Sequence, residues 1–502
     1  MATFCIALAC LVLGYFLYGT FVEKVFGVDP ERTTPCYTKQ DGADYIPMPT
    51  WKVYTVQFLN IAGTGPIFGA IMGAMFGPSS FLWIVLGSIF AGGVHDYFCG
   101  MLSIRHGGAT MPDIIGHYFG KPIRSFMLVF SLLLLLLVGV VFVYSPALIL
   151  GDIAPIASSG EKSIMIWVFI VFIYYVIATL LPVDKLIGKI YPLFAVALLF
   201  MAAALCVCLF VKWPSIPEFW DGLGNMGASV GLEGQPIFPC LFITIACGAI
   251  SGFHSTQSPL MARCMVNEKQ GRPIFYGAMI TEGVVALIWA AVSSYFFFDG
   301  GKEAVGALSG QAPEVVTSVA KSWLGIFGGI LAILGVVAAP ITSGDTAFRS
   351  ARLILADFLH VDQQKKLNRL YIAIPLFAVA ILLLWYNIAD QNGFNTIWRY
   401  FGWANQTLAC FTLWTATDYL TRKYGYDKLL DPEKIVATPK RPWYLLTMIP
   451  ACFMTSVCVT YIFVDKVGFN LPDSVIPYIG IGTFLLSFIS HYAIRIHRTK
   501  KA

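Results

Sequence analysis

Charged residues are scarce in this chain of 502 residues: Asp, Glu, Lys and Arg make up 12% of it, against a hydrophobic fraction of 57%. Such a composition leaves too little polar surface to keep a globule of this size dissolved in water. The mean hydropathy of +0.73 points the same way. These values exclude a soluble enzyme and a nucleic-acid-binding protein, and they make lipid the expected solvent.

The apolar residues form about thirteen stretches of roughly 20 residues, each long enough to cross a hydrocarbon core about 30 Å thick. The predicted fold class is therefore all-α, a polytopic membrane protein with one transmembrane domain over residues 1–502. The spans are expected near residues 3–27, 51–77, 80–103, 125–150, 163–182, 188–212, 236–260, 273–298, 314–345, 367–388, 395–420, 443–465 and 473–496.

A disulfide framework is not expected from the 12 cysteines, because most lie inside apolar spans and are interpreted as small packing residues. Cys36 and Cys264 lie in connections predicted to face the cytoplasm, where thiols stay reduced. His95, Cys99 and His106 give weak support for a metal site, and whether they bind a metal is left open.

Lys and Arg gather in alternate connections, and the cytoplasmic loops of membrane proteins retain positive charge. The richer set includes Arg105, Arg263 and Lys434, whereas the opposite set includes Lys162 and Lys302. The N-terminus is therefore predicted outside and the C-terminus inside, which fits an odd number of spans. On this interpretation the net charge of +5 reflects topology, and no nucleic-acid partner is expected.

Two spans are interrupted by glycine, proline and small polar residues. The second contains Asn60-Ile61-Ala62-Gly63-Thr64-Gly65-Pro66, and the seventh contains a similar run from Cys247 to Pro259. Proline removes a backbone donor and clashes with the preceding turn, so neither run is expected to hold a regular helix. Non-helical backbone at membrane depth is tolerated only where it lines a cavity or is buried in protein.

The two interruptions begin two sets of five spans, at residues 51–212 and 236–420. Because five is odd, the second set starts from the opposite face, which predicts an inverted repeat with a binding site at the midplane. Residues 1–50 add an N-terminal helix and a cytoplasmic loop, and residues 421–502 add a loop and two C-terminal helices.

Glycines also occur where membrane helices pack closely, and this explanation is preferred for Gly69, Gly73 and Gly77. For Gly63 to Gly65 a binding role is preferred, because freed carbonyls suit a cation and a half-helix N-terminus suits an anionic group. The polar residues near the interruptions are mostly uncharged, which favours a small carboxylate or a short zwitterion. The candidate substrate-binding residues are Gly63, Thr64, Gly65, His254, Ser255, Thr256, Gln257, Asn405 and Gln406.

Ionisable residues inside spans are costly and usually face a cavity or a partner. Asp96, Glu282 and Asp345 are predicted to serve proton coupling or charge pairing. Capping or salt bridges to Arg105 or Arg349 are the alternative for Asp96 and Asp345, which lie near span ends. Glu282 lies far from either end of its span, and a structural hydrogen bond is its alternative. His254 is a candidate proton or carboxylate partner.

The stretch from Ala339 to Thr346 offers hydroxyl groups that suit sodium. Thr342 and Thr346 share a helix face, with Ser343 beside them. The alternative is that these hydroxyls hydrogen-bond to their own helix.

Several blocks of the chain resemble the carbon starvation protein family, often called CstA. The blocks are Gly42-Ala43-Asp44-Tyr45-Ile46-Pro47, Ala62-Gly63-Thr64-Gly65-Pro66, Phe238-Pro239-Cys240-Leu241-Phe242 and Phe401-Gly402-Trp403-Ala404-Asn405-Gln406. The resemblance implies nutrient uptake across the bacterial inner membrane during carbon limitation, with peptides or pyruvate as substrates. The run Ser255-Thr256-Gln257-Ser258-Pro259 departs from the enterobacterial members, which leaves the substrate open.

The resemblance also implies the leucine-transporter-like fold of the amino acid, polyamine and organocation transporters. That fold has a 5+5 inverted repeat, here with one extra N-terminal helix and two C-terminal helices. Carried over by motif, a sodium site is expected at Ala339, Thr342 and Ser343, completed by the carbonyls of Leu59 and Ala62.

The sequence thus predicts an ion-coupled symporter that imports small carbon nutrients and is not an enzyme. Sodium or a proton is the expected coupling ion, with no other cofactor, and the expected partners are the small-molecule substrate and membrane lipid. A membrane-embedded enzyme is the main alternative, but the sequence shows no nucleophile beside a base and no clustered metal ligands. A nutrient sensor without transport is a further alternative, and a channel is disfavoured by the repeated interruptions.

Overall fold

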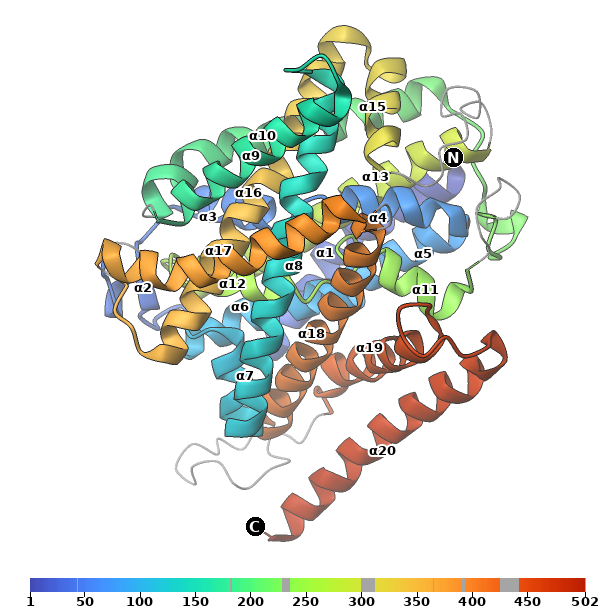
Figure 1. Cartoon of the computed structure of the whole chain (residues 1–502). Helices are drawn as coiled ribbons and strands as arrows, with labels where there is room; N and C mark the ends of the chain where they lie inside the picture. Colours follow the sequence, from blue (N-terminus) through green and yellow to red (C-terminus); the bar gives the residue numbers. More distant parts are fainter. Residues whose placement is uncertain are drawn as a thin grey trace.

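The computed structural model describes residues 1–42, 44–180, 183–227, 235–298, 312–363, 365–390, 393–424 and 442–501. These residues are almost entirely helical, and the β-pairing among them is confined to one bridge between Met48 and Met265. Figure 1 shows the helices packed into one bundle, with α8 and α16 crossing its middle. The fold class predicted from the long apolar stretches is confirmed as all-α for the described residues.

The described helices are named in chain order. The first ten are α1 (Ala2–Phe26), α2 (Pro35–Thr38), α3 (Thr50–Ile61), α4 (Gly65–Gly73), α5 (Pro78–Leu86), α6 (Gly93–Arg105), α7 (Met111–Phe119), α8 (Lys121–Ile153), α9 (Gly160–Leu180) and α10 (Val183–Lys212). The others are α11 (Ile237–Thr244), α12 (His254–Ala262), α13 (Gly277–Phe298), α15 (Ala312–Trp323), α16 (Gly325–Leu359), α17 (Lys366–Ala389), α18 (Gly393–Lys423), α19 (Leu445–Val464) and α20 (Ile476–Lys501).

Within the described residues, nine helical segments are long and apolar enough to cross a membrane, and the bent pair α3 and α4 raises the number to ten. The expected thirteen spans exceed this number. The expected span at 236–260 is divided between the short helices α11 and α12, and the span at 314–345 is divided between α15 and α16. The span at 395–420 lies within α18, whose many polar residues reduce its hydropathy.

Both predicted interruptions contain a break, but the second is displaced from its expected bounds, because residues 254–259 of the predicted run lie in the helix α12, with Pro259 inside it. The first lies between α3 and α4, whose axes differ by 45°. The second lies between the end of α11 at Thr244 and the start of α12 at His254. We call residues 62–64 the first break and residues 245–253 the second break.

The helices beside the two breaks approach each other so closely that only glycine fits. A methyl group at Gly65 would lie 2.3 Å from the sulfur of Cys247, and one at Gly69 would lie 2.8 Å from the carbonyl oxygen of Thr244. These contacts place the first break against the second in the interior of the bundle. The packing role expected for Gly69 agrees with its position.

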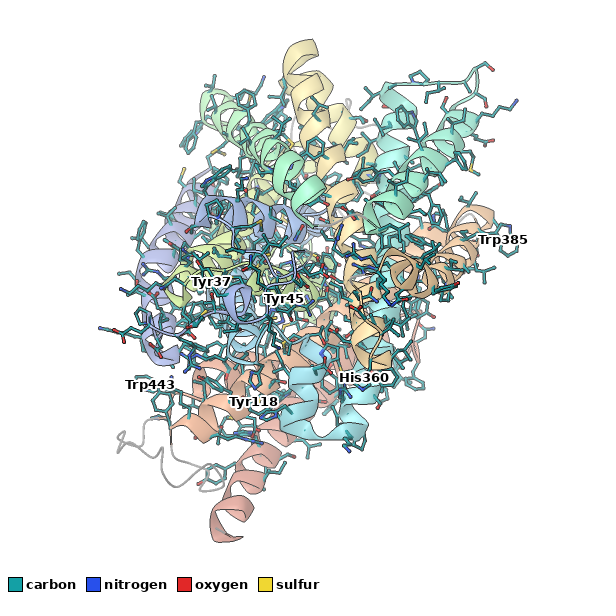
Figure 2. The ribbon with its side chains drawn as sticks, turned by 90° about the vertical axis from the view of Figure 1, so that its left-hand side faces the viewer. Tyr37, Tyr45, Tyr118, His360, Trp385 and Trp443 are labelled. Atoms are coloured by element: carbon teal, nitrogen blue, oxygen red, sulfur yellow. The ribbon has the colours of Figure 1, made fainter. Side chains whose placement is uncertain are left out.

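The periphery of the bundle is rich in exposed apolar and aromatic side chains. Trp385 on α17 is 69% exposed and points outward at the rim in Figure 2. The last helix, α20, lies at the lower edge of Figure 1 beside α19, and only 6% of its apolar stretch is buried within the protein. Such surfaces are what a lipid environment requires.

Candidate functional site

Four ionisable side chains meet beside the second break, and all four are fully buried. The two carboxylate oxygens of Asp96 lie 2.7 Å from His95 Nδ1 and 2.8 Å from His254 Nδ1. The other ring nitrogen of His254, Nε2, lies 3.3 Å from a carboxylate oxygen of Glu282. We call His95, Asp96, His254 and Glu282 the buried cluster.

The buried cluster forms because α6 and its preceding turns press against the second break. A π-helical segment, Gly87–Gly92, joins α5 to α6, and a methyl group at Gly92 would lie 2.2 Å from the carbonyl oxygen of Ala249. Asp96 follows Gly92 by about one helical turn, since a turn holds about 3.6 residues. The carboxylate therefore reaches the first residue of α12, His254.

The unwound backbone of the second break is satisfied by side chains from α5 and the π-helical segment. Trp83 Nε1 donates a hydrogen bond of 2.9 Å to the carbonyl of Ile245, and the hydroxyl of Ser88 donates one of 3.1 Å to the carbonyl of Gly248. Buried carbonyls need such partners, so these two residues stabilise the opened helix.

Helix α18 holds the second break from the other side. The side-chain oxygen of Asn405 accepts the backbone N–H of Phe253 at 2.6 Å and the hydroxyl of Ser251 at 3.0 Å. Gln406 Nε2 donates to the carbonyl of Phe242 at 2.9 Å. Both residues were predicted to bind substrate; Asn405 holds the second break, and Gln406 holds α11 just before it.

The remaining predicted substrate-binding residues lie at the two breaks. Ser255 and Thr256 donate their hydroxyl hydrogens to the carbonyls of Gly252 and Phe253, each at 2.7 Å. Gln257 Nε2 lies 3.3 Å from the hydroxyl of Ser350 on α16. These polar groups therefore turn partly toward their own backbone and partly toward α16.

Several buried polar atoms near the breaks have no hydrogen-bond partner among the described residues. Among them are the Thr64 hydroxyl, Gln257 Oε1, Gln406 Oε1 and both side-chain polar atoms of Asn60. Because buried polar groups are normally hydrogen-bonded, these atoms mark a place for a ligand or water. Asn60 was absent from the predicted site. Its position directly before the first break was the available signal.

The first break meets α16 where the sodium site was expected. The N–H of Gly63 turns to the carbonyl of Ile61 at 2.9 Å, and the hydroxyl of Ser343 donates to the carbonyl of Leu59 at 3.0 Å. The Thr342 hydroxyl instead donates to carbonyls of the preceding turn of its own helix, at 2.8 and 3.0 Å. Thus two of the expected sodium ligands, Leu59 and Ser343, lie in contact. The Thr342 hydroxyl hydrogen-bonds to its own helix, which was the alternative to sodium binding.

Ala62 and Ala339 are the other two residues expected to bind sodium. Both are fully buried, and Ala62 follows α3 with φ −80° and ψ 56°, outside the helical range. Its backbone therefore leaves the helix at the first break.

Asp345 lies apart from the buried cluster. Its carboxylate accepts the hydroxyl of Tyr191 on α10 at 2.7 Å, and its other oxygen lies 4.0 Å from Arg349. The pairing with Arg349 was the alternative for Asp345. The corresponding alternative for Asp96 is wrong, because Arg105 binds Glu268, with its Nε 2.7 Å from a carboxylate oxygen.

The three residues weighed for a metal site do not converge. His95 faces Asp96, the Nδ1 of His106 lies 2.8 Å from the carbonyl of Leu102, and Cys99 lies 3.5 Å from the carbonyl of Ser255. A different set does converge. The ligand atoms of Cys247, His254 and Glu282 all lie within 4.8 Å of one another.

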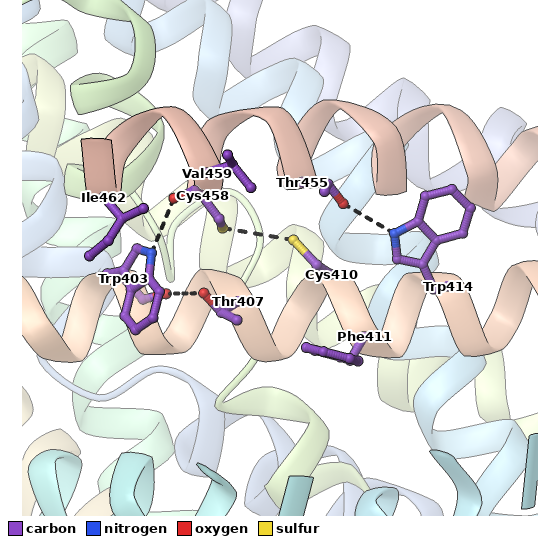
Figure 3. Close-up of a pocket in the computed structure, with 9 residues that line it drawn as sticks. All are labelled: Trp403, Thr407, Cys410, Phe411, Trp414, Thr455, Cys458, Val459 and Ile462. Atoms are coloured by element: carbon purple, nitrogen blue, oxygen red, sulfur yellow. Dashed lines mark hydrogen bonds between the residues drawn. The ribbon is translucent and has the colours of Figure 1, made fainter. Parts of the chain in front are cut away.

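A separate cavity of about 360 Å³ lies between α18 and α19. Figure 3 shows its lining, in which the sulfurs of Cys410 and Cys458 lie 3.7 Å apart. The lining residues are Trp403, Thr407, Cys410, Phe411, Trp414, Thr455, Cys458, Val459 and Ile462. None of them belongs to the buried cluster.

Comparisons with known proteins find relatives among membrane proteins and transporters. An uncharacterized membrane protein of Haemophilus influenzae is 50% identical over 336 residues, covering 59% of this chain and 90% of that protein. The peptide transporter CstA of Campylobacter jejuni is 26% identical, covering 83% of this chain and 75% of that protein. The pyruvate/proton symporter BtsT of Escherichia coli is 27% identical, covering 56% of this chain and 47% of that protein.

Among solved structures, a manganese transporter of Eremococcus coleocola aligns with a TM-score of 0.53 at 14% identity, covering 92% of this chain and 99% of that one. The likeness shows a shared fold. The family model for carbon starvation protein CstA matches residues 1–160, 152–325 and 304–460. With its apolar helices and transporter relatives, the chain is a multi-pass membrane protein, and it belongs to the carbon starvation protein CstA family.

Proposed function

We propose that this protein is a cation-coupled symporter that imports small carbon nutrients, either a small carboxylate such as pyruvate or a short peptide. The observation that carries the proposal is the contact of two broken helices beside a fully buried carboxylate and histidine cluster. Broken helices at a repeat interface are where secondary transporters bind substrate and coupling ion. Buried ionisable groups inside spans mark ion pathways.

The substrate class is supported by the polar atoms at the breaks. Asn60, Thr64 and Gln257 each offer buried polar atoms without a partner among the described residues, and none of these side chains is charged. The helix α4 begins beside them, at Gly65, and a helix N-terminus favours a negative group. A carboxylate is common to pyruvate and peptides, the substrates named for the relatives BtsT and CstA.

We propose a proton as the coupling ion. The support is the arrangement of Asp96 and Glu282 on opposite nitrogens of His254, together with the naming of BtsT as a proton symporter. Sodium is the second candidate, and the contact of Ser343 with the Leu59 carbonyl supports it. The same uptake assay distinguishes the two, because each ion gradient can be imposed alone.

The finer architecture is part of the proposal. We propose thirteen spans, a 5+5 inverted repeat and membership of the amino acid, polyamine and organocation superfamily. An inverted repeat explains why one break lies in the first span of residues 51–212 and the other lies in the first span of residues 236–420. The positive charge of alternate loops supports an N-terminus outside and a C-terminus inside the bacterial inner membrane. The family name supports a link to carbon starvation.

The test is uptake of labelled pyruvate, amino acids and dipeptides into proteoliposomes with an imposed proton or sodium gradient. The unsubstituted protein is expected to accumulate at least one of them and to show counterflow. Glu282→Gln keeps the shape of the side chain but cannot ionise, so it should lose concentrative uptake while its melting temperature stays near that of the parent.

Glu282→Leu is the matched comparison, because it removes hydrogen bonding as well. If Glu282→Gln transports normally while Glu282→Leu misfolds, Glu282 is only structural. If the parent shows neither accumulation nor counterflow with any of these solutes, the symporter proposal is wrong and a sensor or a membrane-embedded enzyme takes its place.

A further inference from the structure

We propose that Cys247, His254 and Glu282 form a binding site for a transition-metal dication of the Zn²⁺ class. Their ligand atoms lie within 4.8 Å of one another, and all three residues are buried. Cys247 comes from the second break, His254 begins α12, and Glu282 lies on α13. This inference goes beyond the proposed transport function, and metal binding can be measured without transport.

In the described part of the chain, two of the three ligand groups, His254 and Glu282, lack hydrogen-bond partners for the atoms that face this site. His254 Nε2 and both carboxylate oxygens of Glu282 have no hydrogen-bond partner among the described residues, although all are buried. His254 Nε2 and Glu282 Oε2 are 3.3 Å apart, within ion-pairing distance but without hydrogen-bond geometry. Buried polar atoms are normally satisfied, so a cluster of this kind calls for a ligand.

The outer neighbours of His254 match those of a metal-binding histidine. Metal-ligating histidines almost always give their other ring nitrogen to a carboxylate or carbonyl, which fixes the tautomer. Here His254 Nδ1 lies 2.8 Å from Asp96, and Asp96 is held in turn by His95 at 2.7 Å. The arrangement leaves Nε2 of His254 as the nitrogen that faces Glu282 and Cys247.

The sulfur of Cys247 lies among polar side chains of the second break and of α18. The hydroxyl of Ser251 lies 3.4 Å from its sulfur, and Asn405 Nδ2 donates toward the same sulfur at 3.8 Å. Because the Ser251 hydroxyl gives its hydrogen to Asn405, it can only accept from the thiol, and the Asn405 amide is the donor that faces the sulfur. Their positions are set by the second break and by α18, the elements that also position His254.

The donor set selects the metal class. A thiolate, an imidazole and a carboxylate suit Zn²⁺ and similar transition metals, whereas Mg²⁺ and Ca²⁺ prefer oxygen ligands alone. Zn–N and Zn–S bonds of about 2.0 and 2.3 Å place tetrahedral ligand atoms roughly 3.3–3.6 Å apart. The observed limit of 4.8 Å therefore requires closure by about 1 Å. Three protein ligands leave a fourth position for water or another small ligand.

Occupancy of this site joins the second break to α13. A metal held between them restricts the movement that alternating access requires of a broken helix. Added Zn²⁺ is therefore expected to inhibit uptake. The primary test, however, is binding.

The experiment uses the full chain, purified in detergent and stripped with a chelator. Zn²⁺ binding is measured by elemental analysis and competition titration, and Co²⁺ serves as an optical probe because a thiolate ligand gives a charge-transfer band. One metal ion per chain and a thiolate band are expected. Cys247→Ser should remove the band, His254→Gln should remove high-affinity binding, and Asp96→Asn should weaken binding by about 10- to 100-fold.

Two controls identify the site. Cys240→Ser changes another buried cysteine near the second break, and the double substitution Cys410→Ser with Cys458→Ser removes the other close thiol pair. Both controls should bind metal like the parent. Cys247→His retains a ligand at this position, so it should restore binding without the thiolate band even if Cys247→Ser is unstable. The proposal is overturned if the folded parent binds no Zn²⁺ or Co²⁺, or if binding survives Cys247→Ser and His254→Gln.

Discussion

At the scale of the residue, Asn405 is the side chain whose role can be assigned most directly. Its side-chain oxygen accepts the N–H of Phe253 and the hydroxyl of Ser251, at 2.6 and 3.0 Å, in a fully buried place. Asn405→Ala leaves both donors without a partner, and each such loss costs about 1–3 kcal/mol. We expect a clear fall in melting temperature and in uptake.

The comparison for Asn405→Ala is Thr412→Ala, two turns further along α18. The Thr412 hydroxyl is also buried, but it donates only to the Leu408 carbonyl of its own helix, at 3.1 Å. Thr412→Ala should therefore change stability little. Thermal unfolding of the two variants in detergent measures the difference, and equal unfolding temperatures would show that Asn405 does not hold the second break.

Residue types in the buried cluster were predictable from the sequence, whereas their partners were not. Glu282 and His254 stood out because an ionisable group in an apolar span is costly. Asp96 was also a candidate for charge pairing, but its partners His95 and His254 could not be named, because its distance from α12 depends on how closely α6 approaches the second break. Cys247 was counted as packing, since a cysteine in an apolar run carries no signal of its own.

At the scale of the element, the close approach of α4 to α11 depends on Gly69. A methyl group there would lie 2.8 Å from the carbonyl oxygen of Thr244, a backbone atom that cannot turn aside as a side chain can. Overpacking of this kind costs about 1–3 kcal/mol, which outweighs the gain of about 1 kcal/mol from replacing a helical glycine with alanine. Gly69→Ala should lower the melting temperature and reduce uptake.

Gly482→Ala on α20 supplies the control for Gly69→Ala, because an added methyl group there meets nothing within 4 Å. It should leave stability unchanged or raise it slightly. Melting curves of both variants, followed by uptake assays, provide the measurement. A neutral Gly69→Ala would mean that α4 and α11 can separate without cost.

Local elements were predictable where the signal is local. Glycine and proline residues indicated both breaks, but the second was expected to extend to Pro259, which α12 accommodates inside its helix. The π-helical segment Gly87–Gly92 has no comparable signal, because it depends on packing against Ala249. The span at 395–420 was predicted and lies within α18, but its apolar signal is weak. The signal is weak because α18 carries polar residues, such as Asn405, that bind the second break.

At the scale of the whole molecule, α20 stands outside the part that forms the site. It packs mainly on α19, where the Ser456 hydroxyl donates to the Gly480 carbonyl at 2.6 Å, and little of it is buried. The family match ends at residue 460, before α20 begins. These observations assign α20 to the edge of the bundle, apart from the buried cluster and the two breaks.

Helix α19 differs from α20, because it covers the polar face of α18. Trp403 donates to the Cys458 carbonyl at 3.1 Å, Trp414 donates to Thr455 at 3.1 Å, and Thr417 donates to Thr447 at 2.9 Å. Since α18 also carries Asn405, loss of α19 would disturb the support of the second break. The two C-terminal helices should therefore respond differently to deletion.

Deletion of residues 473–502 removes α20 alone, and we expect uptake by proteoliposomes to stay within about twofold of the full chain, as for a surface perturbation. Deletion of residues 443–502 removes α19 as well, exposes the indoles of α18 and leaves their hydrogen bonds unmade, so the protein should aggregate or lose uptake. Size-exclusion chromatography and uptake at equal protein amounts distinguish the two. If the shorter deletion folds but no longer transports, α20 is required for transport. Its position at the edge of the bundle would then not mean that the site works without it.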